Sequence, residues 1–330
     1  MAHSLPKLSV VIPIYNEELA IRENVTILVG ALNDIQRGGK NGVVIREWEL
    51  VLVNDGSTDK TLDIIQEEAQ KESRIKIASY KTNRGRGHAL KTGFKTATGD
   101  YIVVTESDLN WGSEIIGQFV VALEGEDVDI VIASPHMKGG GMENVPFFRW
   151  ALSHFGNKVF SIALPGKFTM VTGMTRAYRR EVLESLDLES EDKELHVEII
   201  YKSLDLGFRI IEIPAMLRWK KPVPGVEIRK SHFKPTQIVK HLAMSFFIRP
   251  FMLFGTVGLT LLGLGIAMGV YLLILSSSGT PVVGRPMLFA AVLFIIIGFQ
   301  VLLFGFLANQ NRNLKRQLSR VQRDINRRRS

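Results

Sequence analysis

The chain has 330 residues, 46% of them hydrophobic and 22% charged, and it contains no cysteine. This composition excludes a disordered chain, a disulfide scaffold, a thiolate zinc site and a cysteine nucleophile. The formal net charge is +8, but residues 309–330 hold eight Arg and Lys against one Asp, so the rest of the chain is nearly neutral. That basic segment has no aromatic residue to stack on bases, and we therefore expect no nucleic-acid partner.

The first 215 residues alternate short β-branched runs with segments of helical spacing. The predicted strands are 7–12, 48–54, 75–79, 101–105 and 128–133, and the predicted helices are 17–32, 58–71 and 87–97. This βαβαβαβ order indicates a parallel sheet covered by helices. Ligands of such sheets bind at the carboxyl ends of the strands.

Polar side chains follow three of these predicted strands. The three sequences are Pro13-Ile14-Tyr15-Asn16-Glu17, Asn54-Asp55-Gly56-Ser57-Thr58-Asp59 and Glu106-Ser107-Asp108-Leu109-Asn110. Singly, Asn16 and Ser57 or Thr58 are also explained as helix N-caps, and Asp55-Gly56 as a turn. Because the carboxyl ends of parallel strands meet at one edge, the three together favour a single site there.

The Glu106-x-Asp108-x-Asn110 pattern is a candidate metal site. In an extended segment alternate side chains share a face, so the two carboxylates and the amide oxygen would point the same way. A small number of hard oxygen donors suits Mg²⁺ or Mn²⁺, which keeps other positions for water and a substrate pyrophosphate. The competing interpretation is a turn with solvated acids.

Two other features are candidates for chemistry. Arg84-Gly85-Arg86-Gly87-His88 opens the third predicted helix, where backbone N–H groups and cations favour an anion, and the chain has no GxxxxGK[ST] phosphate loop. His196 is either a general base or, as is commoner for a lone histidine on a helix, a core residue.

Two long segments without charge follow residue 249. They are Pro250–Leu275 and Met287–Leu307, each long enough to cross the roughly 30 Å hydrocarbon core of a bilayer. Basic residues flank the pair on its outer ends, so the positive-inside rule predicts that both termini are cytoplasmic. Residues 231–249 mix apolar and basic side chains, which indicates an amphipathic helix at the membrane surface.

Small and apolar residues in this part of the chain also suggest helix association. Gly265-x-x-x-Gly269 has the spacing that lets two helices approach closely, and it is compatible with a homo-oligomer. Leu314, Leu318, Val321 and Ile325 recur on one helical face of the basic tail, which fits either a short coiled coil or an interfacial helix.

The motifs taken together resemble a known family. They are Pro13-x-Tyr15-Asn16-Glu17, Asn54-Asp55-Gly56-Ser57-x-Asp59, Asn83-Arg84-Gly85-x-Gly87-x-Ala89, Gly93-Phe94-x5-Gly99-Asp100 and Glu106-x-Asp108. The series is similar to the family 2 glycosyltransferases of the GT-A fold, and more narrowly to the polyprenyl-phosphate (dolichyl-phosphate) sugar synthases. The resemblance covers about residues 7–215.

This resemblance implies a fold and a division of the chain. The fold is α/β and GT-A-like, a mostly parallel sheet flanked by helices, followed by an interfacial helix and a transmembrane hairpin. The implied parts are a cytoplasmic glycosyltransferase domain at 1–230, a juxtamembrane amphipathic helix at 231–249, two transmembrane helices at 250–308 and a basic cytoplasmic tail at 309–330.

The resemblance also assigns roles to residues. The nucleotide-sugar pocket would contain Pro13, Tyr15, Glu17, Asp55 and Lys91. Glu106, Asp108 and Asn110 fall where the family has a metal-binding Asp-x-Asp-x-Gln, so two of three positions are substituted, and Asp108 and Glu106 would be catalytic. Arg229, Lys230 and Ser231 would bind the acceptor phosphate, with Glu198 as the family's later acidic residue.

The implied reaction is an inverting transfer of a hexose from a nucleotide diphosphate sugar to a polyprenyl or dolichyl phosphate on the cytoplasmic face of the membrane. We expect UDP-glucose as donor and Mg²⁺ or Mn²⁺ as cofactor, with membrane lipids as further partners. The alternatives are a dolichyl-phosphate mannose synthase that uses GDP-mannose, a processive or protein-directed glycosyltransferase, and a non-catalytic subunit that binds a nucleotide sugar. The Gln-x-x-Arg-Trp motif of processive enzymes is missing, because Arg149-Trp150 follows Val145-Pro146-Phe147-Phe148.

Overall fold

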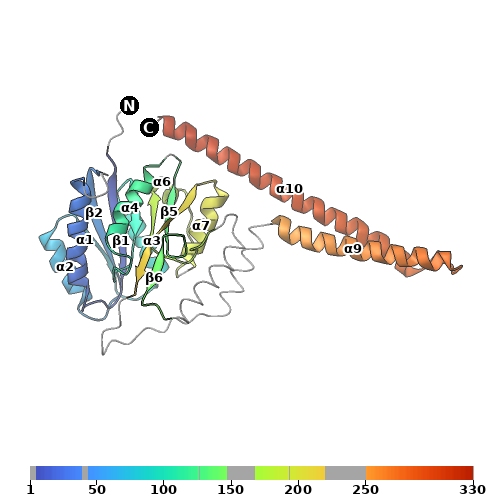
Figure 1. The fold of residues 1–330 in the computed structure, drawn as a ribbon, viewed down its shortest axis with the longest axis horizontal. Helices are drawn as coiled ribbons and strands as arrows, with labels where there is room; N and C mark the ends of the chain where they lie inside the picture. The colour runs from blue at the N-terminus through green and yellow to red at the C-terminus, as the bar shows by residue number, and fades with distance from the viewer. Residues whose placement is uncertain are drawn as a thin grey trace. The chain divides into compact units, whose positions relative to one another are not determined.

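The structure is a computed structural model that describes residues 5–38, 44–125, 127–146, 168–192, 194–219 and 250–329. The chain divides into two compact units, one containing the described residues through 219 and the other those from 250. Each unit is described by itself (Figure 1). The predicted amphipathic helix at 231–249 and the predicted acceptor residues Arg229, Lys230 and Ser231 lie outside the described residues.

Within the described residues, the first unit is built on a seven-stranded sheet in the order β3-β2-β1-β4-β7-β5-β8. The strands are β1 (Lys7–Ile14), β2 (Glu47–Asp55), β3 (Ile75–Tyr80), β4 (Tyr101–Val104), β5 (Ile130–Ser134), β7 (Arg176–Arg179) and β8 (Ile210–Pro214). All neighbours are parallel except at β7, which runs antiparallel to both β4 and β5. A separate parallel pair joins β6 (Gly141–Glu143) to β9 (Met216–Arg218). The expectation of a mostly parallel α/β sheet is confirmed.

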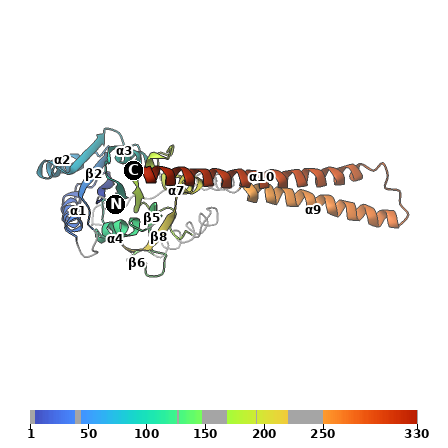
Figure 2. The same cartoon turned by 90° about the horizontal axis from the view of Figure 1, so that it is seen from above.

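Helices lie along the sheet in both views (Figures 1 and 2). They are α1 (Ile21–Gln36), α2 (Thr61–Lys71), α3 (Arg86–Thr96), α4 (Glu114–Leu123), α6 (Arg180–Glu184) and α7 (Leu195–Asp205). In α1 the buried side chains recur at helical spacing, at Ile21, Val25, Leu28 and Leu32, and form the stripe that faces the core. The central strands are buried on both faces because helices cover them, so they form continuous β-branched runs.

Two differences from the predicted elements have physical causes. The first helix begins at Ile21 and not at residue 17, because Asn16 has a left-handed φ of 53° and a turn closes on the carbonyl oxygen of Glu17 before the helix starts. The helix α4 was not predicted. Its sequence EIIGQFVVAL is apolar nearly all round, so it carries little of the period by which a surface helix is recognised.

A buried carboxylate stabilises the amino-terminal edge of the sheet. Glu49 on β2 is 3% exposed and accepts hydrogen bonds from Ser9 Oγ (2.7 Å) and Thr98 Oγ1 (2.7 Å), while Lys76 Nζ lies 2.7 Å from it. Burial would raise the pKa of Glu49, but the interactions with Lys76, Ser9 and Thr98 outweigh burial and lower the pKa to about 2. This carboxylate therefore joins β1, β2, β3 and the turn before β4.

Glu49→Gln should remove an acid-sensitive part of the stability. Because the folded pKa is lower than the unfolded value of about 4.3, the contribution of Glu49 is complete above that pH and is lost as the pH falls toward 2. The shift corresponds to about 3 kcal/mol, so the thermal unfolding midpoint of Glu49→Gln should be well below wild type at pH 7 and depend less on pH below 4.5. The control is Glu47→Gln on the same strand, whose carboxylate is 48% exposed. Equal midpoints for the two variants at pH 7 would contradict this account.

The second unit contains a hairpin of two long helices, α9 (Pro250–Ser277) and α10 (Pro286–Arg329). Their apolar stretches, Leu253–Ser277 and Pro286–Leu314, are long and apolar enough to cross a membrane by length and composition. The helix α10 continues through the predicted basic tail to Arg329. Leu314, Leu318 and Val321 on it are exposed.

Glycines allow the two helices of the hairpin to approach closely. A Cβ on Gly258 would lie 2.8 Å from the carbonyl oxygen of Gly298, and one on Gly265 would lie 2.9 Å from that of Ala291. Gly263 and Gly269, by contrast, have open space around the same position. Gly265 thus packs against α10 of the same chain. The homo-oligomer suggested by the spacing of Gly265 and Gly269 stays a prediction.

Gly265→Leu should separate the hairpin helices, whereas Gly269→Leu should be tolerated, because only the first side chain would occupy space held by α10. The two variants have the same chemistry on the same helix and so form a matched pair. A disulfide between cysteines introduced at facing positions of α9 and α10 would report the separation in membranes. Equal crosslinking of the two leucine variants would show that the glycine contact does not determine the packing.

Candidate functional site

The loops that follow β1 and β2 are joined by side chains at the carboxyl edge of the sheet. The Asn16 N–H donates to Ser57 Oγ at 3.0 Å, and the Thr58 N–H donates to Asn16 Oδ1 at 2.8 Å. One residue further, the Glu17 N–H donates to Thr61 Oγ1 at 2.8 Å. The alternative of N-caps is wrong for Asn16, Ser57 and Thr58, because the helices begin after Ala20 and Lys60. These side chains instead hold two loops together.

The predicted nucleotide-pocket residues of the first strand lie at this edge. Pro13 is on β1, and Tyr15 and Glu17 are in the loop after it; all three are half-buried. They are brought near the end of β2 by parallel pairing, which aligns Pro13 with Val53. The structure therefore brings Pro13, Tyr15 and Glu17 to the same edge as Asp55.

Asp55 ends β2 and holds the segment that leads into α3. Its Oδ1 accepts from Tyr80 Oη and from the Arg84 N–H, both at 2.8 Å, and its Oδ2 accepts from the Gly85 N–H at 3.2 Å. The Asn83 side chain donates to the Asp55 carbonyl oxygen at 3.1 Å. Burial, together with the hydrogen bond to Asp55, raises the pKa of Tyr80. Tyr80 stays protonated as a donor, and Asp55 orders the start of α3.

The loop after β4 is a turn and not an extended segment, so the period-two argument for Glu106, Asp108 and Asn110 was wrong. Leu109 has a left-handed φ of 53°, and strand geometry ends at Val104. The turn nevertheless brings two of the groups together: Asn110 donates to Asp108 through its backbone N–H at 3.1 Å and through its side-chain amide at 2.5 Å. Asn110 is buried, and Glu106 and Asp108 are half-buried.

Two further residues that the sequence did not single out hold this turn. Asn24, buried on α1, donates to the carbonyl oxygen of Ser107 at 2.7 Å. The Arg218 N–H of β9 donates to the carbonyl oxygen of Asn110 at 2.8 Å. The sequence offered one signal for the Asn24 contact, an asparagine on the apolar face of a predicted helix. It offered none for the Arg218 contact.

The electrostatics of the turn fit a divalent cation. Burial first, and then the neighbouring Asp108 carboxylate, raise the pKa of Glu106 to about 7, while Arg86 and a hydrogen bond with Trp111 act in the opposite direction. No group of three or more His, Cys, Asp or Glu side chains able to hold a metal occurs among the described residues. The donor set predicted for this turn is two carboxylates and one amide oxygen, and a cation bound there would relieve the repulsion between Glu106 and Asp108.

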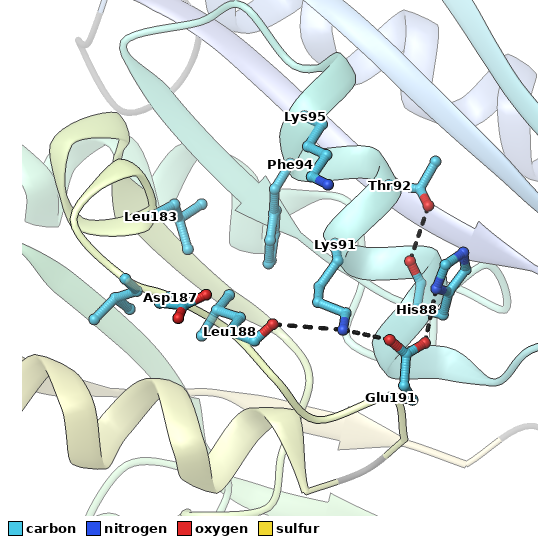
Figure 3. Close-up of a pocket in the computed structure, with 10 residues that line it drawn as sticks. His88, Lys91, Thr92, Phe94, Lys95, Leu183, Asp187, Leu188 and Glu191 are labelled. Carbon is cyan, nitrogen blue, oxygen red and sulfur yellow. Dashed lines mark hydrogen bonds and ion pairs between the residues drawn. The ribbon is translucent and has the colours of Figure 1, made fainter.

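Lys91 lies on α3, and its mostly covered side chain lines a cavity of about 320 Å³ between α3 and the segment that follows α6. Figure 3 shows its ammonium group directed at Glu191. The distance from Nζ to Glu191 Oε1 is 2.6 Å, and the carbonyl oxygen of Glu189 is 3.3 Å away. The predicted donor contact of Lys91 stays a prediction. Glu198 accepts the N–H groups of Glu189 and Ser190, both at 2.9 Å, so it orders the same loop.

A fully buried arginine orders the segment before β7, and sequence reasoning missed it. Arg176 is 0% exposed and donates to the carbonyl oxygens of Val171, Gly173 and His196. His196 is itself 1% exposed, and burial, with help from Arg176, lowers its pKa well below the usual range. This agrees with the core interpretation of His196.

Fold and site together define a protein of the α/β class whose acidic and amide side chains gather at the carboxyl ends of parallel strands. Residues 9–187, more than half of the chain, match the family model "Glycosyl transferase family 2". The chain belongs to that family.

The chain is also similar to curated proteins and to solved structures. The chain is 33% identical over 211 residues to a dolichol-phosphate mannosyltransferase of Pyrococcus furiosus, covering 63% of this chain and 55% of that protein. It therefore spans about half the length of this relative. It is 28% identical over 236 residues to a polyprenol monophosphomannose synthase of Mycolicibacterium smegmatis, and the match covers 68% of this chain and 84% of that protein. A glucosyl-3-phosphoglycerate synthase from Mycobacterium tuberculosis, solved with Mn²⁺ and uridine diphosphate, aligns with a TM-score of 0.47 at 20% identity, covering 84% and 82%.

Proposed function

We propose that this protein transfers mannose from GDP-mannose to the phosphate of a polyprenyl or dolichyl phosphate, with inversion at the anomeric carbon. The observation that carries the proposal is the family match over the sheet, combined with relatives whose names specify mannose and a lipid phosphate. These relatives favour mannose over the glucose expected from the sequence. The apolar hairpin supports the lipid acceptor, because a polyprenyl tail stays in the bilayer and its phosphate must be met at the membrane surface.

The chemistry of the acceptor determines what the site has to do. A phosphate monoester is already an anion near pH 7, so its oxygen attacks the anomeric carbon without loss of a proton to the protein. The bond from that carbon to the β-phosphate oxygen breaks, and GDP leaves with the electron pair. The remaining tasks are to orient donor and acceptor and to stabilise the charge on the leaving diphosphate.

The loops at the carboxyl edge of the sheet and the start of α3, which together we call the rim, contain residues suited to those tasks: Asp55, Arg86, Glu106, Asp108 and Asn110. Asp55 fixes the Arg84–Gly85 segment through two backbone N–H groups, and Arg86 on the first turn of α3 is close enough to Glu106 to lower its pKa. Glu106, Asp108 and Asn110 would hold Mg²⁺ or Mn²⁺, which supplies positive charge to the departing diphosphate. The cytoplasmic orientation of both termini, and acceptor binding by Arg229, Lys230 and Ser231, are parts of this proposal.

A transfer assay with labelled nucleotide sugars tests the proposed donor. Purified full-length protein in detergent should move label from GDP-mannose, and not from UDP-glucose, into an organic extract when undecaprenyl phosphate is supplied. Label from UDP-glucose alone would restore the original expectation of a glucosyltransferase. Label in a polymer or in protein would indicate a processive or protein-directed enzyme, and nucleotide-sugar binding with no transfer would indicate a non-catalytic subunit.

The metal proposal predicts a strong effect at one carboxylate. Asp108→Asn should lower turnover by about 10²-fold or more, the range observed when a preorganised electrostatic contact is lost, whereas Glu106→Asp should be tolerated. EDTA should abolish transfer by wild type, and Mn²⁺ or Mg²⁺ should restore it. Asp63→Asn on the exposed side of α2 is the control for the loss of one negative charge. Near-normal turnover of Asp108→Asn, or full activity in excess EDTA, would refute the metal site.

A further inference from the structure

The loop formed by residues 187–192 packs directly on the first turn of α3. The His88 N–H donates to the carbonyl oxygen of Glu191 at 3.0 Å. A Cβ on Gly87 would lie 2.6 Å from both the Glu191 carbonyl carbon and the Asp192 carbonyl oxygen, so a larger residue would displace the loop. The backbones of two segments about a hundred residues apart in sequence are therefore in contact at the start of α3.

The side chain of Glu191 reinforces this contact through His88 and Lys91 of α3 and through Arg84 before it. Glu191 Oε2 lies 2.7 Å from His88 Nδ1, and Oε1 lies 2.6 Å from Lys91 Nζ, as Figure 3 shows. Arg84 adds a longer ion pair at 3.9 Å. Hydrogen bonds from Lys91, partly opposed by desolvation and helped by His88, lower the pKa of Glu191. We call the contacts of Glu191 with Arg84, His88 and Lys91 the Glu191 bridge.

The bridge continues through Tyr80 to Asp55, a predicted residue of the nucleotide pocket. The imidazole of His88 packs edge-on against the ring of Tyr80, with centroids 5.1 Å apart. Tyr80 Oη donates to Asp55, and the same carboxylate accepts the backbone N–H groups of Arg84 and Gly85. Asp55 is thus joined to loop 187–192 by an unbroken series of contacts through Tyr80 and His88.

The other side of the loop is held independently. Glu198 on α7 accepts the N–H groups of Glu189 and Ser190, and Lys202 pairs with Glu198 at 2.7 Å. The Glu189 side chain reaches Lys202 at 3.2 Å and is 81% exposed. Loss of the Glu191 bridge would therefore leave the loop attached to α7, and its contact with α3 would be reduced to the backbone contacts with Gly87 and His88 and the Lys91 contact with the Glu189 carbonyl oxygen.

We propose that Glu191 is a positioning residue for the donor nucleotide: by joining loop 187–192 to His88 and Lys91, it fixes the Arg84–Gly85 segment and, through Tyr80, the carboxylate of Asp55. The proposal rests on the proposed function only in naming the donor as a nucleotide sugar. Removing Glu191 frees His88 and Tyr80 to move, so the groups that face the nucleotide lose their fixed positions. The series consists of Glu191, His88, Tyr80 and Asp55, of which Asp55 is a predicted donor-pocket residue and none is a predicted acceptor residue.

The test compares two glutamates of one loop. Glu191→Ala should raise the GDP-mannose KM by about fivefold or more while changing the undecaprenyl-phosphate KM less than about twofold, and Glu191→Gln should lie between it and wild type. Glu189→Ala, whose carboxylate faces α7, should leave both constants within about twofold. His88→Ala combined with Glu191→Ala should be no worse than the more severe single variant, because both remove one series of contacts.

Hydrogen exchange on the full chain supplies a readout that needs no turnover. Amides of residues 83–88 should exchange faster in Glu191→Ala than in wild type, and at the wild-type rate in Glu189→Ala. If wild type neither transfers mannose nor binds GDP, the proposed function fails, while the exchange result still tests the bridge. An unchanged donor KM, the same donor defect in Glu189→Ala, or unaltered exchange at 83–88 would each overturn the role of Glu191.

Discussion

The carboxyl edge of the sheet depends on one requirement: backbone N–H groups in the loops there need acceptors, and short acidic and amide side chains supply them. Asp55 accepts two N–H groups of the Arg84–Gly85 segment, Asn16 accepts that of Thr58, and Asp108 accepts that of Asn110. An unpaired buried polar group costs about 1–3 kcal/mol, so the partly buried bonds of Asp55 and Asp108 restrict their loops more than the exposed bond between Asn16 and Thr58 does. The acidic and amide side chains at this edge of the sheet thus also fix the shape of its loops.

This dual use explains which parts of the site were predictable. The strands and the polar residues at their ends followed from β-branched runs and from the rule for parallel sheets, so the location of the site could be inferred. The partners of those residues could not. Whether Asp55 faces a ligand or the N–H groups of a neighbouring loop depends on contacts with Tyr80 and Arg84, which are 25 and 29 residues away. Spacing within one motif contains no information about such pairs.

Two of the elements that were not predicted, α4 and β7, share a different cause. The helix α4 is apolar on nearly every side. The strand β7 contains a buried arginine, Arg176, and arginine in a sequence usually indicates an exposed position. In both cases tertiary burial overrides the local pattern. The buried guanidinium is tolerated because three carbonyl oxygens satisfy it, and none of those contacts can be recognised before the chain is folded.

The acceptor that we propose gives a reason why the site is organised around positioning and charge. A hydroxyl acceptor would need a base near its proton, but a phosphate monoester does not. His196 is buried, and neither of its ring nitrogens is hydrogen-bonded to any residue that the structure describes. Burial lowers its pKa, so His196 of α7 packs as part of the core. What the rim supplies instead is rigidity. Asn24 on α1 and Arg218 on β9 hold the turn that contains Asp108, and Glu191 holds the start of α3. For the proposed reaction between two anionic substrates, preorganised loops and fixed charges are the contributions that a protein can make before either substrate binds.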